Sequence, residues 1–133
     1  MDADYSPYRW FRPSEFLLCV PSCYIEQMDP DFLKRLDEAR EIAGFPFVLN
    51  SAYRSKEYEI QKKGRSGTSS HTKGVAVDIS CLTGPYRFRM VLALIQAGFR
   101  RIGIANTFIH VDSDPDKDPS IWIYQNGHNV FKP

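Results

Sequence analysis

Apolar residues recur at helical spacing in the first third of the chain, between clear start and stop signals. Asp29 followed by Pro30 has the form of a helix N-cap with proline at the first helical position. The apolar positions after it lie three and four residues apart, and Gly44 supplies the stop. Residues 56–63 are polar and consist mainly of helix-forming types. Residues 87–98 are strongly apolar and end in a glycine. Helices are therefore predicted over residues 30–43, 56–63 and 87–98.

Alternating and β-branched segments predict strands in the remainder of the chain. In GVAVDIS, a period of two places Val75, Val77 and Ile79 toward a core. The other face then carries Ala76, Asp78 and Ser80. RIGIANTFIHVD has the pattern of a hairpin that turns at Ala105-Asn106. Strands are predicted over residues 45–50, 74–80, 101–104, 107–112 and 121–124.

This order of elements indicates an α+β fold, with an antiparallel sheet and flanking helices. The chain has 133 residues without a repeat or linker, so residues 1–133 are expected to form a single domain. With 17 Lys+Arg and 16 Asp+Glu the formal net charge is +1, which removes the main physical reason to expect a nucleic-acid partner. No apolar run approaches the roughly 18 to 20 residues of a membrane span.

The N-terminus and the cysteines point to synthesis in the cytoplasm. MDADYSPYRWFRPSEF lacks the basic start and the apolar run of a secretory signal. The three cysteines are odd in number, so they cannot all pair within one chain, and reduced thiols are expected. Cys19 and Cys23 lie four apart, but no second pair completes a four-thiolate zinc site.

Two of the three histidines lie near acids in or beside predicted strands. His71 precedes Asp78 by seven residues, and His110 shares a strand face with Asp112, two residues on. Imidazole nitrogen and carboxylate oxygen are zinc ligands, and a catalytic zinc takes three protein ligands and water. His71, Asp78 and His110 would supply such a site, although a strand histidine is more often a core or surface residue. Asp78 could equally cap a turn or pair with an arginine.

Three ordered segments resemble the zinc D-alanyl-D-alanine carboxypeptidase family. Residues 69–78, SSHTKGVAVD, are similar to its S-x-H-x-x-G-x-A-x-D signature. SAYRS at 51–55 resembles its S-G-Y-R-S segment, and FIHVD at 108–112 its F-[IV]-H-x-D segment. Ser14-Glu15-Phe16 and Trp122 also fit the short, single-domain branch. The same clan includes the vancomycin-resistance D-Ala-D-Ala dipeptidase, phage L-alanyl-D-glutamate endolysins and the hedgehog signalling domain, whose fold is then expected here.

The resemblance implies one Zn²⁺ ion, bound by His71, Asp78 and His110. It also implies that Arg54 takes part in catalysis by pairing with the C-terminal carboxylate of a D-Ala-ended peptide. A surface salt bridge is the alternative for Arg54. Ser69 is expected either to hydrogen-bond the substrate or to orient His71, and an ordinary loop serine is its alternative.

The chain departs from the family pattern at the general base. Many members carry an acid three residues before the last histidine ligand, where this chain has Thr107. Asp112 is the best substitute: it would take the proton of the zinc-bound water and return it to the leaving amine. The rival interpretation is that Asp112 only holds His110 in its tautomer.

The expected function is hydrolysis of a peptidoglycan stem peptide next to a D-amino acid, as a carboxypeptidase or an endopeptidase. The alternative is a catalytically weak or inactive module with the same fold, which binds cell-wall peptide or a protein partner. We expect a monomer. With no signal expected, action at the cell wall would suit release by a holin or a place in a phage particle.

Overall fold

A sheet in the order β1-β2-β4-β3-β5-β6 forms the centre of the computed structural model, which describes residues 4–125 and 128–129. Every neighbouring pair is antiparallel except β3 and β5, which run parallel. The parallel pair arises because the chain returns after β4 through residues 113–119 and enters β5 beside β3. The strands are β1 (Leu49–Ser51), β2 (Ala76–Ser80), β3 (Arg101–Ile104), β4 (Phe108–Asp112), β5 (Ser120–Gln125) and β6 (His128–Asn129).

Within the described part of the chain, side-chain caps begin three of the four α-helices. Asp29 accepts a hydrogen bond from the Phe32 amide at 2.9 Å, and Ser55 and Thr83 cap their helices in the same way. The last helix therefore starts earlier than its apolar pattern predicts. The helices are α1 (Pro13–Leu17), α2 (Pro30–Ala43), α3 (Lys56–Lys63) and α4 (Gly84–Gln96), with 3₁₀ turns η1 (Ile25–Gln27) and η2 (Ser70–Lys73).

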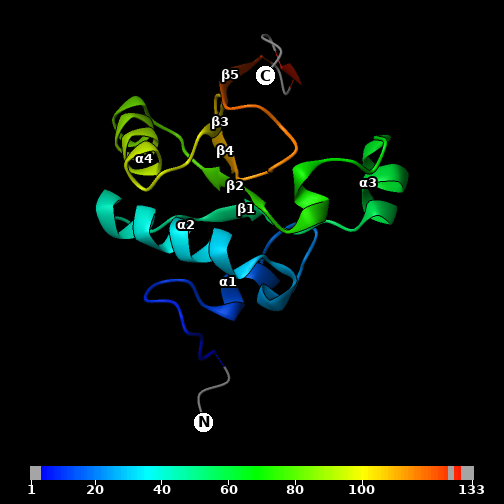
Figure 1. Ribbon diagram of the computed structural model, residues 1–133, viewed down its shortest axis with the longest axis horizontal. Helices are drawn as coiled ribbons and strands as arrows, with labels where there is room; N and C mark the ends of the chain where they lie inside the picture. Colours follow the sequence, from blue (N-terminus) through cyan, green and yellow to red (C-terminus); the bar gives the residue numbers. More distant parts are fainter. Residues whose placement is uncertain (1–3, 126–127, 130–133) are drawn as a thin grey trace.

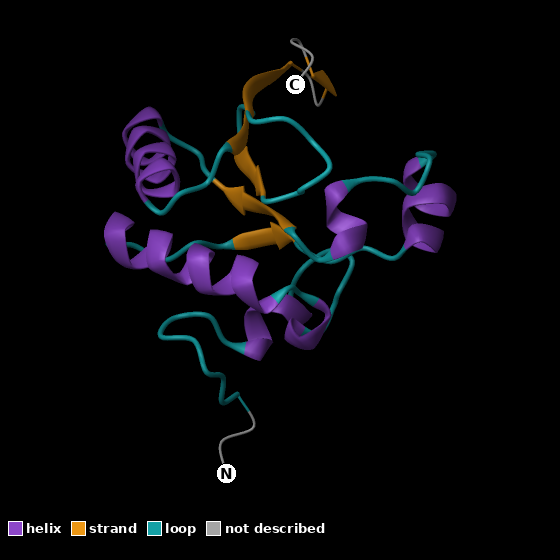
Figure 2. Cartoon of the chain, viewed as in Figure 1, coloured by secondary structure: helices purple, strands orange, loops and turns teal. Residues whose placement is uncertain are grey.

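The two faces of the sheet differ in chemistry because side chains alternate along each strand. Val77 pairs with Val111, and Ile79 pairs with Ile109, on the face that belongs to the hydrophobic core. The core also includes Leu36 of α2 and other buried residues of α2 and α4. Figures 1 and 2 show α2 and α4 together on one flank of the sheet, with α3 on the opposite side. The polar side chains of β2 and β4 occupy the face away from this core.

The predicted alternation in β2 is confirmed, since Val77 and Ile79 are core residues. β1 is shorter than predicted and begins at Leu49, because only its end pairs with β2. The short helix α1 and the 3₁₀ turns η1 and η2 were not predicted. Among the described residues no helix is long and apolar enough to cross a membrane.

Candidate metal centre and active-site cleft

Three side chains of the metal-ligand type converge on the polar side of the sheet. One potential ligand atom from each of His71, Asp78 and His110 lies within 4.8 Å of the others. Asp78 and His110 are directly opposite each other on β2 and β4. His71 comes from η2, outside the sheet. The structure thus brings together the three residues that the sequence singled out.

His71 is oriented by a backbone carbonyl. Its Nδ1 lies 2.7 Å from the oxygen of Ala52, and the Arg54 amide donates to the oxygen of His71 at 3.3 Å. With Nδ1 donating to Ala52, Nε2 carries the lone pair and lies 3.5 Å from Asp78 Oδ2. Burial lowers the pKa of His71 despite the nearby Asp78 carboxylate, so the neutral form that binds metals is favoured.

Asp78 and His110 form the second half of the centre. Asp78 Oδ1 lies 3.0 Å from His110 Nδ1, and Asp78 Oδ2 accepts a hydrogen bond from Arg54 Nη2 at 3.2 Å. Burial raises the pKa of Asp78, but the charges and hydrogen bonds of His71 and His110 outweigh it and hold the pKa below its ordinary value. Burial lowers the pKa of His110, but its hydrogen bonds to Asp112 and Asp78 raise the pKa overall.

The carboxylate of Asp112 is fully engaged by neighbours. Its Oδ2 lies 2.7 Å from His110 Nε2, and its Oδ1 accepts from Arg101 Nε at 2.7 Å and from the Asp114 amide at 3.1 Å. Asp112 is only 1% exposed. Arg101 is also buried, with its guanidinium 4.8 Å from the centre of the Trp122 ring. These contacts favour the second of the two roles expected for Asp112, that of holding His110.

The donor set fits a divalent zinc ion. Two imidazoles and one carboxylate, brought from three elements, are the ligand types of a catalytic zinc site with one open position. His71 and His110 each direct one ring nitrogen at Asp78, while the other nitrogen contacts Ala52 oxygen or Asp112. Such outer partners are those that metal-bound histidines need.

Arg54 and Ser69 lie beside the centre but do not contact it in the expected way. Arg54 is 5% exposed, donates to Ser51 as well as to Asp78, and lies 3.5 Å from the carboxylate of Glu59. The hydroxyl of Ser69 donates to the same Glu59 carboxylate and not to His71. Pairing of Arg54 with a substrate carboxylate stays a prediction.

The centre opens into a cleft of about 360 Å³. One wall is aromatic, with Phe108, Trp122 and Tyr124, and the Trp122 ring lies 5.4 Å from that of His110. The cations Arg54, Arg65, Arg101 and Lys117 line the cleft, against the carboxylates of Asp78 and Asp112. Arg65 is 54% exposed. Thr107 is exposed and does not line this cleft.

A buried carboxylate joins the loop after β4 to η2. Asp114 accepts hydrogen bonds from Ser70 Oγ and Lys73 Nζ, both at 2.8 Å, and Lys117 Nζ lies 3.6 Å away. Burial raises the pKa of Asp114, but the hydrogen bonds from Lys73 and Ser70 lower it to about 2. Ser70 precedes His71, so this cluster helps to hold the turn that carries the first histidine.

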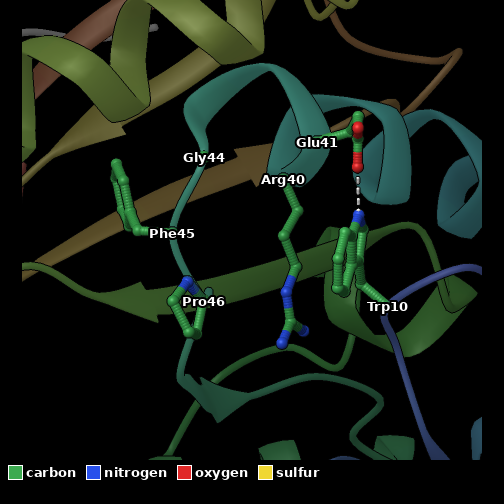
Figure 3. Close-up of a pocket in the computed structure, with 6 residues that line it drawn as sticks. All are labelled: Trp10, Arg40, Glu41, Gly44, Phe45 and Pro46. Carbon is green, nitrogen blue, oxygen red and sulfur yellow. Dashed lines mark hydrogen bonds between the residues drawn. The ribbon is translucent and has the colours of Figure 1, made fainter.

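A second hollow, of about 300 Å³, lies at the end of α2 (Figure 3). Its polar groups are paired with one another or with neighbours: Trp10 Nε1 donates to Glu41, and Arg40 pairs with Glu15 at 2.8 Å. This hollow contains no histidine or cysteine. It therefore offers no rival catalytic centre.

Sequence reasoning missed three buried charged residues around the site. The observed register of β3 and β4 places Arg101 opposite Asp112, whereas the predicted turn at Ala105-Asn106 would have placed it opposite His110. Glu59 gave no signal, since a glutamate on a polar helix is normally solvated. Asp114 lies in an acidic turn whose alternating acids are also typical of an exposed loop. A Cβ at Gly74 would lie 2.5 Å from the oxygen of Gln27, so the close neighbour of this glycine is backbone.

Comparison with known proteins supplies the family. No curated protein sequence matches the chain. Among solved structures, the crystal structure of Serratia marcescens L-Ala D-Glu endopeptidase ChiX is similar, with 19% sequence identity and a TM-score of 0.45. That match covers 55% of this chain and 63% of the ChiX chain, which is less than two thirds of its length. The sequence profile of the family described as Peptidase M15 matches residues 10–112, which is most of the chain and includes all three ligand-type residues. The chain belongs to the M15 peptidase family.

Proposed function

We propose that this chain is a zinc peptidase that cleaves a peptidoglycan stem peptide next to a D-amino acid, as a carboxypeptidase or an endopeptidase. The observation that carries the proposal is the convergence of His71, Asp78 and His110 within 4.8 Å at an open cleft. Membership of a peptidase family supports hydrolysis of a peptide bond. The ordered motifs around these three residues support a substrate with a D-amino acid.

His71, Asp78 and His110 would hold the ion. Zinc supplies a Lewis acid for the scissile carbonyl oxygen and for the attacking water. Ala52 and Asp112 keep each imidazole in the tautomer that leaves one nitrogen free to bind. Because Asp112 is engaged by His110, Arg101 and the Asp114 amide, its proposed role is to position His110.

The cleft is suited to a peptide that carries a carboxylate. Its four lining cations exceed its two lining carboxylates, so the field in the cleft attracts anions even before a divalent ion is counted. Arg54 is the proposed partner of the peptide carboxylate, although it reaches solvent only narrowly. Arg65 lines the same cleft and is far more exposed than Arg54, so it offers a second cation for an ion pair with the substrate carboxylate.

Metal analysis combined with peptide hydrolysis tests the proposal. The purified chain should contain about one zinc per molecule. It should release D-Ala from a D-Ala-D-Ala peptide, or split a stem peptide internally. A chelator should stop the reaction and added zinc should restore it. Bound zinc without turnover of either peptide would contradict the peptidase proposal but would support the metal site.

The second candidate is a peptide-binding module with little or no activity. It is favoured by Thr107 at the usual position of the base and by the engaged carboxylate of Asp112. This module would bind a stem peptide with measurable affinity, and the bound peptide would remain intact after long incubation with zinc.

A further inference from the structure

Two cysteines that the proposed function does not use meet at the end of α1. The carbonyl oxygen of Phe16 accepts hydrogen bonds from the amides of both Cys19 and Cys23, each at 3.2 Å. The intervening residues therefore fold back on themselves, and the two cysteines come together. Both are 4% exposed.

The two thiols also contact each other. Cys19 Sγ lies 3.5 Å from the oxygen of Glu15, Cys23 Sγ lies 3.8 Å from the oxygen of Phe16, and the two sulfurs share a hydrogen bond. That bond raises the pKa of Cys19 and, with the Tyr53 amide, lowers the pKa of Cys23 to about 7 despite burial. Cys23 is thus the sulfur that ionises first, and Cys19 is the donor.

The third cysteine provides the contrast. Cys81 is buried beside the start of α4, with its sulfur 3.9 Å from the oxygen of Thr83. Burial raises its pKa, which disfavours the reactive thiolate. Burial alone therefore raises a thiol pKa in this protein, and the lowered pKa of Cys23 comes from its hydrogen bonds.

We propose that Cys19 and Cys23 form a redox-active dithiol that closes into an intrachain disulfide by exchange with a small disulfide such as oxidised glutathione. The thiolate of Cys23 attacks the glutathione disulfide, forms a mixed disulfide and releases one glutathione thiolate. Cys19 then loses its proton, and its sulfur attacks the sulfur of Cys23 and releases the second glutathione. In sum, two protein thiols are oxidised to one disulfide, and one glutathione disulfide is reduced to two thiols.

The pair is joined to the backbone that orients His71. The Tyr53 amide donates to Cys23, and the neighbouring Ala52 oxygen accepts from His71 Nδ1. Cys19 Sγ also lies 3.9 Å from the oxygen of Leu49 in β1. Closing the disulfide links the two ends of the turn at residues 19–23, which lies beside this segment, and restricts the unfolded chain by a short loop.

Redox titration of the folded chain tests the proposal. After equilibration with oxidised glutathione, the free thiols should fall from three to one and the mass by about 2 Da. Peptide mapping should find Cys19 linked to Cys23. The unfolding midpoint should rise by about 5 °C and return with dithiothreitol, as expected for a loop of this size.

Single variants separate this pair from general thiol oxidation. Cys81→Ser should retain the mass loss and the midpoint shift, whereas Cys19→Ser and Cys23→Ser should lose both. Mapping of the unsubstituted chain decides the linkage even where a serine variant folds poorly. A persistent glutathione adduct, a linkage through Cys81, or three unreacted thiols would overturn the proposal.

Discussion

Substitutions of Asp112 give the sharpest test of how the centre is built. Its two expected roles, as general base or as the residue that positions His110, predict different effects on zinc affinity and on kcat. Asp112→Ala removes the 2.7 Å contact with His110 Nε2, while Asp112→Asn keeps an oxygen that can accept this hydrogen bond. A histidine ligand that loses its outer partner typically costs about 10- to 100-fold in metal affinity. This corresponds to about 1.4 to 2.7 kcal/mol of binding free energy. The alanine variant also leaves Arg101 buried without its carboxylate, and about 3 kcal/mol of folding stability should be lost.

The assay is a zinc titration against a chelating dye, together with kcat measured at saturating zinc and well below the unfolding midpoint. If Asp112 positions His110, Asp112→Ala should bind zinc about 10- to 100-fold more weakly and Asp112→Asn less than about tenfold more weakly. At saturating zinc, kcat of the asparagine variant should stay within about tenfold of the parent.

Asp116→Asn is the matched control, since this acid lies on the same loop but its side chain is 77% exposed and does not contact His110. It should change neither zinc affinity nor kcat. A general base predicts the reverse pattern for Asp112→Asn: unchanged zinc affinity and a kcat lower by about 10²- to 10⁴-fold. That result would refute the positioning role.

Three more outcomes follow from the structure. His71→Ala should lose both stoichiometric zinc and hydrolysis, and turnover by the metal-free variant would reject the scheme. Gly74→Ala should destabilise the chain by more than about 2 kcal/mol in urea unfolding, because it adds a clash with backbone to a left-handed φ of 72°. Gly64→Ala, with φ of 63° and no atom within 4 Å of the added Cβ, should cost only about 1 kcal/mol, and equal losses would contradict this reasoning. The pKa of Asp114, about 2 against an ordinary 3.8, predicts stability that is fully present above pH 4 and lost as the pH falls toward 2. This contribution is at most about 2 kcal/mol, and acid unfolding of Asp114→Asn should lack it.

Much of the fold was predictable because its helices and strands carry local signals. The Asp29 cap and the Gly44 stop bound α2 as expected, and the bounds of α3 agree with the prediction. α4 begins before its apolar stripe, since Thr83 caps a first turn that contains proline. The parallel pairing of β5 with β3 has no local signal, because it depends on how the loop between β4 and β5 returns.

The ligand-type residues of the site were predictable from motif spacing, whereas their surroundings were not. Asp78 and His110 lie opposite each other because the register of β2 and β4 places them there. The burial of Glu59 depends on its tertiary contacts with Arg54 and Ser69, which the polar sequence of α3 does not reveal. The unexpected contacts of Ser69 and Arg54 follow from this buried carboxylate.

The three ligand-type side chains have unequal mechanical support. Asp78 and His110 stand on neighbouring strands whose hydrogen-bond ladder sets their spacing, while His71 stands on a separate turn tied by Ala52, Ser70 and Gly74. Residues 64–70 and 113–119 border the cleft without forming part of that ladder. Substitutions in these borders can therefore change the lining of the cleft while the separation of Asp78 and His110 stays fixed by the strands.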